Sequence, residues 1–465
     1  MYNKINNKII KLLSNIAGPE NILSENKDLE PFSRDETPGA CYFPEAVIKP
    51  TQINQVKEIL KLANKENFPV IPRGGGTSLT GGSLAVFGGA VISFERLNKI
   101  IDLDTGNKIC VVEPGVINGS MQKEAENLNM FYPVNPASMD SCTMGGNVAE
   151  STGGANTVKY GTTRNYLLGV HGFTGSGEEI KSGGKVIKNS TDQILFQLLC
   201  GSEGTLSIFT KLIFRLINKP LFTSWIIAPF KDIYKITEAS LNVFKQNLQP
   251  TMIELMDSST LKYTQQYLNT EIQYSQYPQL LVRIDSNNKK YLDELCFKLG
   301  DSLFGHGAVD VLMADTKIEQ DKIWKIRSSV HDAIKELPKS MCEEDVVVPL
   351  NKVSDMIKKA YKLSENFSLP AVVFGHLGDG NIHLNFTNPQ NNLKNIEKRI
   401  SDLRKEIFKN VCNLGGKLSG EHGIGISKKP FFKRYIHSGY VNIFKKIKKQ
   451  FDPNYILNPG KIIDL

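Results

Sequence analysis

Three of the seven histidines in this sequence fall in two short glycine-flanked motifs. His376 and His383 lie in the segment 375–385, GHLGDGNIHLN, and Glu421 and His422 lie in GEHGIG, residues 420–425. Two imidazoles and one carboxylate suit a divalent metal that keeps a coordination position open for substrate. We therefore predict that His376, His383 and Glu421 bind a divalent metal. Zn²⁺ is the first choice, and the spacing also leaves Mn²⁺, Fe²⁺ or no metal open.

Two strands must position these side chains. The dipeptide Asp-Gly at 379–380 is typical of a hairpin turn between two apolar runs. Because alternate residues of a strand point to the same side, Asn381, His383 and Asn385 would share one face, with His376 at the end of the neighbouring strand. Three ordinary structural histidines are the alternative, but the grouping in two motifs favours a site.

A glycine-rich loop forms the second chemical feature. The segment 72–82, PRGGGTSLTGG, follows an apolar run and holds five glycines within nine residues, more than a tight turn needs. Such a loop lets successive N–H groups approach a phosphate, and Thr77 and Ser78 add hydroxyl donors. Leu79 stands where the dinucleotide fingerprint requires its third glycine, and no Gly-Lys-Ser/Thr ending follows. Neither a Rossmann NAD site nor a nucleotide triphosphatase is therefore supported.

A second glycine-rich stretch follows some 70 residues later. Pro136 and Ser138 precede TMGGNVA at 143–149, and two further glycines stand at 153–154. Two loops so far apart in sequence can wrap one extended ligand, and a dinucleotide such as FAD has the length to need both.

These loops, together with EPGV at 113–116 and GSEGTL at 201–206, resemble the FAD-binding domain of the vanillyl-alcohol-oxidase type. Within that family the chain is similar to the group of D-lactate dehydrogenase, glycolate oxidase and D-2-hydroxyglutarate dehydrogenase. The motifs keep their order over residues 40–465. The resemblance implies FAD, and because no histidine lies beside the loops we expect it to be non-covalent. The implied cofactor-binding residues are Arg73, Gly74, Gly75, Gly76, Thr77, Ser78, Gly81, Gly82, Pro136, Ser138, Thr143, Gly146, Asn147, Gly153 and Asn458.

The resemblance also implies roles at the second site. It repeats the metal-ligand set above and makes His422 the general base, which suits an imidazole whose pKa is near neutrality. Arg327, on a predicted helix, would bind the substrate carboxylate with its planar fork, although a solvated helical arginine is an even alternative. Asn385 would hydrogen-bond the substrate.

The implied reaction is oxidation of a small 2-hydroxy acid, D-lactate or glycolate, by hydride transfer to flavin N5. The acidic run at 343–345 favours a monocarboxylate over a diacid. The alternatives are the flavin subunit of a glycolate oxidase-type complex, a D-2-hydroxyglutarate-type dehydrogenase and a non-catalytic FAD-binding protein. The electron acceptor stays open among a quinone, a cytochrome and an electron-transfer protein.

The element order predicts an α+β fold. We expect an N-terminal helix and loop at 1–40, a two-part FAD-binding domain at 41–219, a substrate (cap) domain with the metal site at 220–439, and a segment at 440–465 that returns to the FAD domain. The cap domain should hold an antiparallel sheet with helices on one face.

Composition sets the remaining limits. The net charge is +8, and late lysines such as Lys445, Lys446, Lys448 and Lys449 are interpreted as a solvated helix face. No aromatic residues alternate with them, so no nucleic-acid platform is expected. Seven scattered cysteines without a CxxC pair favour a reducing compartment. No apolar run reaches 18 residues, so we expect a cytoplasmic protein without a transmembrane segment, with peripheral membrane contact left open.

Overall fold

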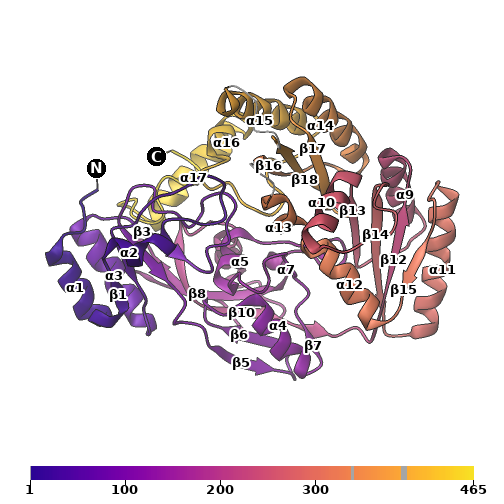
Figure 1. Ribbon diagram of the computed structural model, residues 1–465. Coiled ribbons are helices and arrows are strands. Elements are labelled where there is room, and N and C mark those ends of the chain that lie inside the picture. Colours follow the sequence, from indigo (N-terminus) through magenta and orange to yellow (C-terminus); the bar gives the residue numbers. More distant parts are fainter. Residues whose placement is uncertain (1, 337–339, 389–394, 465) are drawn as a thin grey trace. The chain divides into compact units, whose positions relative to one another are not determined.

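The computed structural model describes residues 2–336, 340–388 and 395–464 (Figure 1). The chain divides into two compact units. Unit 1 comprises Met1–Thr152, Thr162–Lys219 and Glu421–Leu465, and unit 2 comprises Gly153–Gly161 and Pro220–Gly420. In contrast to the expected ranges, this division counts 153–161 with unit 2 and 421–439 with unit 1.

The first sheet of unit 1 has four strands in the order β1-β2-β4-β3. Strands β2, β4 and β3 are parallel, and β1 is antiparallel. Helix α3 begins after Gln52, which forms a capping box with Gln55, and it ends at Asn67 in the left-handed region (φ 53). The elements of this part are α1 (Asn7–Ala17), β1 (Ile22–Leu23), α2 (Asn26–Leu29), β2 (Ala46–Ile48), α3 (Ile53–Glu66), β3 (Val70–Arg73) and β4 (Ala90–Ser93).

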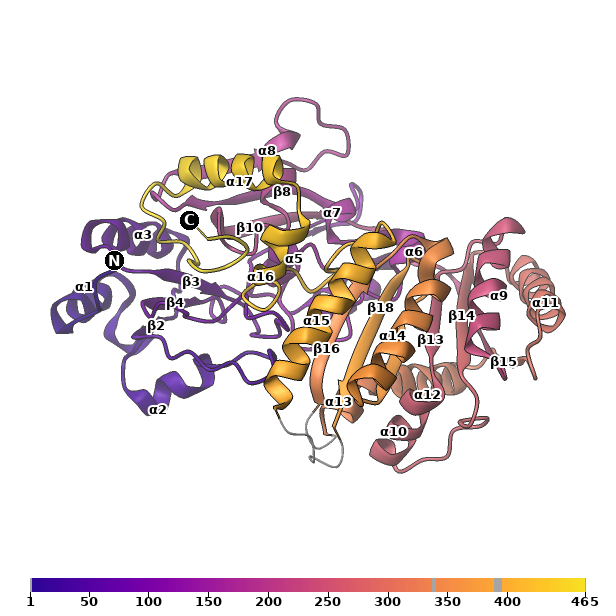
Figure 2. The ribbon, with the colours of Figure 1, turned by 90° about the horizontal axis from the view of Figure 1, so that it is seen from above.

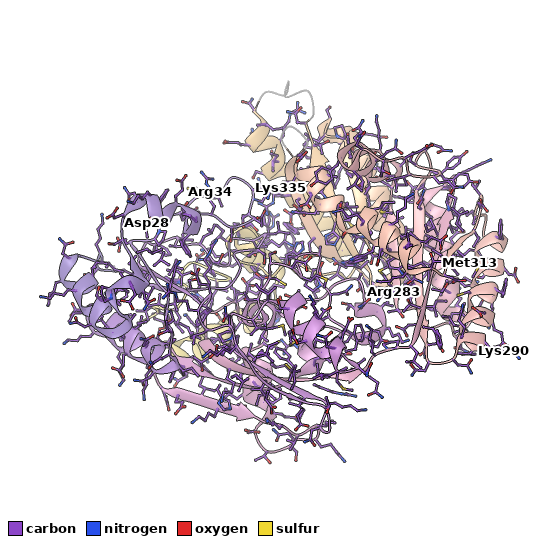
Figure 3. All side chains as sticks on the ribbon, turned by 60° about the horizontal axis from the view of Figure 1, so that its bottom comes forward. Asp28, Arg34, Arg283, Lys290, Met313 and Lys335 are labelled. Carbon is purple, nitrogen blue, oxygen red and sulfur yellow. The ribbon has the colours of Figure 1, made fainter. Side chains whose placement is uncertain are left out.

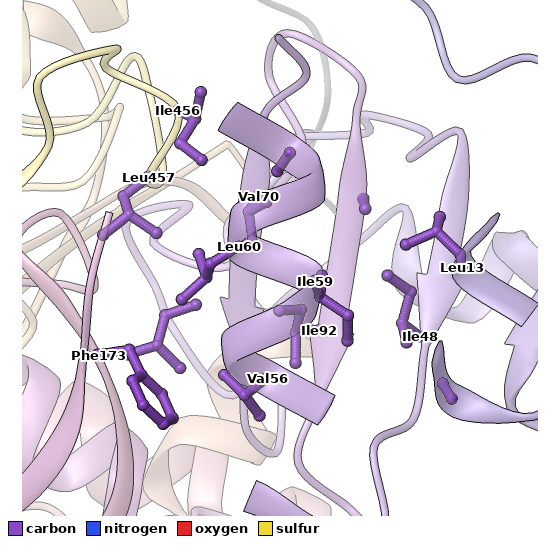
Figure 4. Close-up of a cluster of buried hydrophobic side chains, with 14 of the residues drawn as sticks. Leu13, Ile48, Val56, Ile59, Leu60, Val70, Ile92, Phe173, Ile456 and Leu457 are labelled. Atoms are coloured by element: carbon purple, nitrogen blue, oxygen red, sulfur yellow. The ribbon is translucent and has the colours of Figure 1, made fainter. Parts of the chain in front are cut away.

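The core of this part is an apolar cluster between helices and sheet. The buried residues of α3 recur at 56, 59, 60 and 63, the spacing of one helix face. Figure 4 shows Ile59 and Leu60 of this face beside Val70 of β3, with Leu13 of α1 in the same cluster. The packed helix holds β3 rigidly, and the glycine-rich loop begins where β3 ends.

The second sheet of unit 1 is antiparallel, with the order β5-β6-β10-β8-β9. Strands β8 and β9 of this sheet form a hairpin, and Gly177 in its turn has φ +81. The two sheets make this unit two-part, as predicted. Its elements are β5 (Ile100–Asp104), β6 (Ile109–Val112), α4 (Asn118–Asn127), β7 (Met130–Phe131), α5 (Met144–Glu150), α7 (Thr163–Tyr166), β8 (Leu167–Thr174), β9 (Glu179–Gly183), α8 (Gln193–Leu199), β10 (Ser207–Arg215) and β11 (Ile217–Asn218).

The C-terminal segment contributes α16 (Lys429–Tyr435) and α17 (Ser438–Phe451) to unit 1. Beyond α17 the chain returns to the first sheet, where Leu457 bridges to Val70 and the Val70 N–H donates to Ile456 O at 2.8 Å. The interpretation of all four late lysines as solvated is wrong for Lys448, which is only 3% exposed. Its ammonium donates to Asp452 at 2.5 Å and to two main-chain carbonyls, and burial lowers its pKa although Asp452 opposes the shift.

Unit 2 is built on one seven-stranded sheet in which every neighbouring pair is antiparallel, as predicted. The strand order is β15-β12-β14-β13-β17-β18-β16. The strands are β12 (Phe222–Pro229), β13 (Met252–Met256), β14 (Gln279–Ser286), β15 (Leu312–Ala314), β16 (Ser340–Val347), β17 (Ala371–His376) and β18 (Asn381–Thr387).

Helices cover both faces of this sheet, so the expectation of a single covered face is wrong (Figure 2). One face holds α9 (Ile233–Lys245), α11 (Lys289–Gly305), α14 (Val353–Phe367) and α15 (Ile396–Asn413). The other holds α10 (Ser258–Leu268), α12 (Lys317–Ser328) and α13 (Val330–Lys335), whose apolar residues pack on Met252, Met256 and Phe374. Because the central strands are apolar on both faces, both must be buried.

The segment 153–161, with α6 (Thr157–Tyr160), belongs to unit 2, where it makes part-buried polar contacts. Arg283 of β14, labelled in Figure 3, donates to Asn156, and its guanidinium lies 5.6 Å from the Trp225 ring centroid. Lys159 forms an ion pair with Asp285, and the Tyr160 hydroxyl donates to the same carboxylate at 2.9 Å.

No helix of the described residues is long and apolar enough to cross a membrane.

Replacing Lys448 with Ala should lower the free energy of unfolding by about 3 kcal/mol, because Asp452 loses its buried cation. Lys449 is exposed on the same helix, and Lys449→Ala should change that free energy by less than about 0.5 kcal/mol. Urea unfolding followed by circular dichroism measures both. Equal losses for the two variants would contradict the buried role of Lys448.

Candidate active site

The two predicted cofactor loops meet inside unit 1. A side-chain carbon at Gly74 would overlap the Thr143 hydroxyl, and one at Gly75 would overlap the Ser141 carbonyl oxygen. Thr143 caps helix α5, and its hydroxyl accepts from the Gly146 N–H at 3.2 Å. Glycine is therefore required at 74 and 75 because the second loop passes directly over the first.

The polar groups of these loops fit a phosphate-bearing ligand. None of the hydrogen bonds among the described residues uses the N–H groups of Gly74, Gly75, Gly76 or Thr77 as a donor. Four such amides in succession form a cradle for an anion. Asn458 reaches the same region, since its amide donates to Gly82 O and Glu203 O at 2.8 Å, and its buried Oδ1 has no partner. These groups fit the pyrophosphate and polar edges of FAD.

The other predicted cofactor residues have different roles in the structure. Arg73 donates to the carbonyls of Pro31 and Arg34 and to the Ser83 hydroxyl. Its guanidinium therefore links the two ends of the glycine-rich loop to the segment 31–34. The Ser78 hydroxyl accepts from the Gly82 N–H at 3.2 Å and closes the loop on itself. Buried Pro136, partly buried Ser138 and buried Asn147 belong to unit 1, whereas Gly153 is counted with unit 2; Gly81 has φ +80, which requires glycine.

The loop that carries Glu421 and His422 is held in unit 1 by Glu203. The Glu203 carboxylate accepts from the N–H groups of Ile424 and Gly425, both at 2.7 Å. The Thr80 hydroxyl also donates to His422 O at 3.0 Å, which ties this loop to the glycine-rich loop. Burial raises the pKa of Glu203 although the two N–H donors oppose the shift. His422 Nε2 lies 3.8 Å from Glu421 Oε1.

The two predicted histidine ligands of unit 2 lie on one face of its sheet. Strand register pairs Glu254 with His376 and Asp345 with His383, and directly paired residues of antiparallel strands share a face. A ring nitrogen of His376 lies within 4.8 Å of one of His383, and the ring centroids are 5.3 Å apart. Asn385 is on the same face, 1% exposed, and its amide nitrogen has no hydrogen-bond partner. The predicted clustering of His376, His383 and Asn385 is therefore present.

Arg327 of α12 reaches this face through Glu254. Its Nε donates to Glu254 Oε2 at 2.7 Å and its Nη2 lies 2.6 Å from the same oxygen. The other oxygen, Oε1, lies 2.6 Å from His376 Nδ1. Burial alone would raise the pKa of Glu254, but Arg327 and His376 outweigh burial and hold that pKa below its usual value. Arg327 is 6% exposed, so the solvated alternative does not apply.

Asp345 of β16 anchors the end of unit 2. Its carboxylate accepts from the Ser419 hydroxyl at 2.7 Å, from the Gly420 N–H at 3.1 Å and from the Asn381 amide at 2.5 Å. Glu421 follows Gly420 directly and opens the last segment of unit 1. The short peptide with Glu421 and His422 is therefore held at both ends. Asp345 binds the N–H of Gly420 before it, and Glu203 binds the N–H groups that follow it.

The acidic run at 343–345 is divided between the two faces. Glu344 points to the opposite face, where it forms a buried ion pair with Arg404 of α15. Glu343 lies 3.4 Å from His331 Nδ1, and this carboxylate raises the pKa of His331 against the effect of burial. Glu343 and Asp345 are thus the acids on the face of His383.

Sequence reasoning missed Glu254, Asp345 and Glu203. Glu254 is an acid inside an otherwise apolar strand, and such a residue is rarely buried without a partner. Asp345 ends an acidic run that was used only to argue the size of the substrate. Glu203 stands within GSEGTL, a motif used only for the family resemblance. These signals were in the sequence, but the partners lie 36 or more residues away along the chain.

Comparison with known proteins agrees with both units. Residues 44–183 match the family described as FAD binding domain, and residues 219–462 match the C-terminal domain of FAD linked oxidases. The chain belongs to the FAD-linked oxidases. It is 33% identical over 456 residues to glycolate oxidase subunit GlcD of Bacillus subtilis, covering 97% of this chain and 95% of that protein. It is 31% identical to D-lactate dehydrogenase of Anaerostipes hadrus, covering 99% and 98%.

More distant proteins share the same architecture. D-2-hydroxyglutarate dehydrogenase of Stutzerimonas stutzeri is 28% identical, with 98% of each chain covered. The solved structure of p-cresol methylhydroxylase superposes with a TM-score of 0.79 at 17% identity, covering 98% of this chain and 97% of that chain. The predicted family, the α+β fold class and the assignment as an FAD-linked oxidoreductase are confirmed.

Replacing Gly75 with Ala should lower FAD occupancy at least about tenfold, because the new methyl group overlaps the second loop and separates the two loops. The ratio of flavin to protein absorbance in the purified enzyme measures the occupancy. Gly184→Ala is the control, since open space surrounds that position. Full flavin content in Gly75→Ala would show that the contact between the loops is not needed.

Proposed function

We propose that this FAD-linked oxidase oxidises a small 2-hydroxy acid, D-lactate or glycolate, to the corresponding 2-oxo acid with the help of a divalent metal. The observation that carries the proposal is the shared face of unit 2, where His376, His383 and Asn385 lie beside a guanidinium held by Glu254. The names of the relatives, glycolate oxidase subunit and D-lactate dehydrogenase, support the same class of substrate.

FAD bound by the glycine-rich loops would accept the hydride from the substrate. The N–H groups of 74–77 would hold its pyrophosphate, and Asn458 and Asn147 would supply further polar contacts. The absence of histidine from these loops agrees with a non-covalent cofactor.

The residues for a divalent metal are His376, His383 and Glu421, and the donor set suits Zn²⁺. A cation bound there would polarise the substrate hydroxyl and lower its pKa. His376 Nδ1 bonds to Glu254 at 2.6 Å, so Nε2 would be the nitrogen that presents a lone pair to the metal. Glu421 follows directly after the peptide that Asp345 holds.

Three groups act on the substrate itself. Arg327 binds the carboxylate, since its Nη1 takes part in none of the hydrogen bonds among the described residues. Asn385 offers its buried amide nitrogen to a substrate oxygen. His422 takes the hydroxyl proton, while the C2 hydrogen leaves as hydride.

The size of the substrate follows from the charges near Asn385. Strand register places Glu343 directly opposite Asn385, where a second substrate carboxylate would meet an acid. A monocarboxylate is therefore favoured over 2-hydroxyglutarate, the substrate in the name of one relative.

Electrons must leave the flavin for an external acceptor, which is a quinone, a cytochrome or an electron-transfer protein. All seven cysteines are free and scattered, so this chain supplies no iron–sulfur centre of its own. The name glycolate oxidase subunit supports an assembly with at least one further chain. A cytoplasmic location, with or without contact at the membrane surface, agrees with these requirements.

Anaerobic flavin reduction tests the proposal directly. The enzyme is mixed with D- and L-lactate, glycolate and D-2-hydroxyglutarate, and loss of flavin absorbance is followed. D-lactate or glycolate should reduce the flavin fastest. Fastest reduction by D-2-hydroxyglutarate would favour that dehydrogenase instead, and a flavin that no 2-hydroxy acid reduces would indicate a non-catalytic FAD-binding protein.

Substituting His422 with Ala should slow flavin reduction by D-lactate by roughly 10²–10⁴, the usual contribution of a general base. The flavin content should be unchanged. His306→Ala is a matched control because that histidine lies at the end of α11 and hydrogen-bonds locally to Ser302 O. An unaltered reduction rate in His422→Ala would exclude this imidazole as the base.

Removal of the metal should also abolish turnover. Dialysis against a chelator is expected to slow flavin reduction, and added Zn²⁺ or Mn²⁺ should restore it. In His383→Ala the metal content, measured by elemental analysis, should fall from about one per chain toward zero because one of three ligands is lost. Full activity of metal-free protein would refute metal assistance.

A further inference from the structure

One buried carboxylate of unit 2 is bonded to two different groups of the proposed site. Glu254 is fully buried in the middle of β13. Its Oε1 faces His376 Nδ1 at 2.6 Å, and its Oε2 faces Nε and Nη2 of Arg327 at 2.7 and 2.6 Å. The two oxygens thus serve one partner each.

We propose that Glu254 is a positioning residue that fixes both the metal-binding His376 and the substrate-binding Arg327. This inference rests on the proposed function, because it concerns how the metal and the substrate carboxylate are presented to each other. It assigns no contact between Glu254 and the substrate.

The contact with His376 sets the ring's tautomer. A carboxylate can only accept a hydrogen bond from the imidazole, so the proton of His376 resides on Nδ1. Nε2 then carries the lone pair with which a neutral imidazole binds a metal. A carboxylate behind a ligand histidine also fixes the ring's orientation and raises its basicity as a ligand.

The contact with Arg327 fixes the direction of the guanidinium. Nε and Nη2 are both directed at Oε2, and the guanidinium carbon lies 5.2 Å from the Phe374 ring centroid. One edge and one face of the planar group are therefore occupied. The N–H groups of Nη1 remain as donors, and their direction is fixed by the bonds of Nε and Nη2. Arg327 is therefore an oriented donor for a carboxylate.

A purely structural ion pair is the alternative, and the sheet contains a matched example of one. Glu344 of β16 is 1% exposed and binds Arg404 on the opposite face. It is a buried glutamate on a strand with an arginine partner, like Glu254, but the structure gives it no imidazole partner. Glu344→Gln therefore reports the loss of a buried ion pair alone.

The test compares Glu254→Gln with Glu344→Gln in the FAD-loaded enzyme. Metal affinity is measured by titration calorimetry with Zn²⁺, and kcat and KM are measured with D-lactate. Glu254→Gln should weaken Zn²⁺ binding by about 10–100-fold and raise KM, because both held groups lose their orientation. Glu344→Gln should lower the unfolding midpoint and leave both values unchanged. Glu254→Asp, which keeps the charge, should recover part of the metal affinity.

A third measurement needs neither metal nor substrate. In metal-free protein labelled with ¹⁵N-histidine, the His376 ring should carry its proton on Nδ1, and Glu254→Ala should shift this signal. This result is independent of the reaction, so a flavin that no 2-hydroxy acid reduces would sink the proposed function and leave the tautomer assignment standing. Unchanged Zn²⁺ affinity, KM and His376 signal in the Glu254 variants would overturn the positioning role.

Discussion

The candidate site of unit 2 depends on one buried carboxylate at a position where an apolar residue would be expected. Glu254 lies in a five-residue strand whose other members are apolar, and it is fully buried. A lone carboxylate there would be costly, because burial disfavours its charged form. The structure solves this with one cation and one hydrogen-bond donor from separate elements, the Arg327 guanidinium of α12 and the His376 imidazole of β17. The requirement to satisfy one charge therefore brings a helix and a strand to the same point on the sheet.

Local sequence predicted the parts of the site that lie within one element. The Asp-Gly turn at 379–380 and the alternation after it placed His383 and Asn385 on one face, and the structure has that arrangement. The antiparallel sheet of unit 2 followed from the order of apolar runs and turns, whereas the parallel pairing of β2, β4 and β3 was not predicted. These features depend on neighbours a few residues away, and the residue types alone carry that information.

The remaining parts depend on contacts that no short window contains. Arg327 lies 73 residues from Glu254, and burial against Phe374 excludes the solvated alternative that its helical position allowed. Arg73 was expected to contact the cofactor, and its guanidinium donates to the carbonyls of residues 31 and 34, so that it supports the cofactor loop. Lys448 sits in a run of lysines that is otherwise typical of a solvated face. Charge and spacing predict such residues poorly because the partner decides their role.

The peptide with Glu421 and His422 combines both kinds of information. Its glycines marked it in the sequence, yet its position is set by carboxylates on either side. Asp345 holds the N–H of Gly420 in unit 2, and Glu203 holds those of Ile424 and Gly425 in unit 1. This peptide contains 420–421, one of the four points at which the chain passes from one unit to the other. Glu421 and His422, the proposed metal ligand and the proposed base, therefore lie on a short span with main-chain hydrogen bonds at each end.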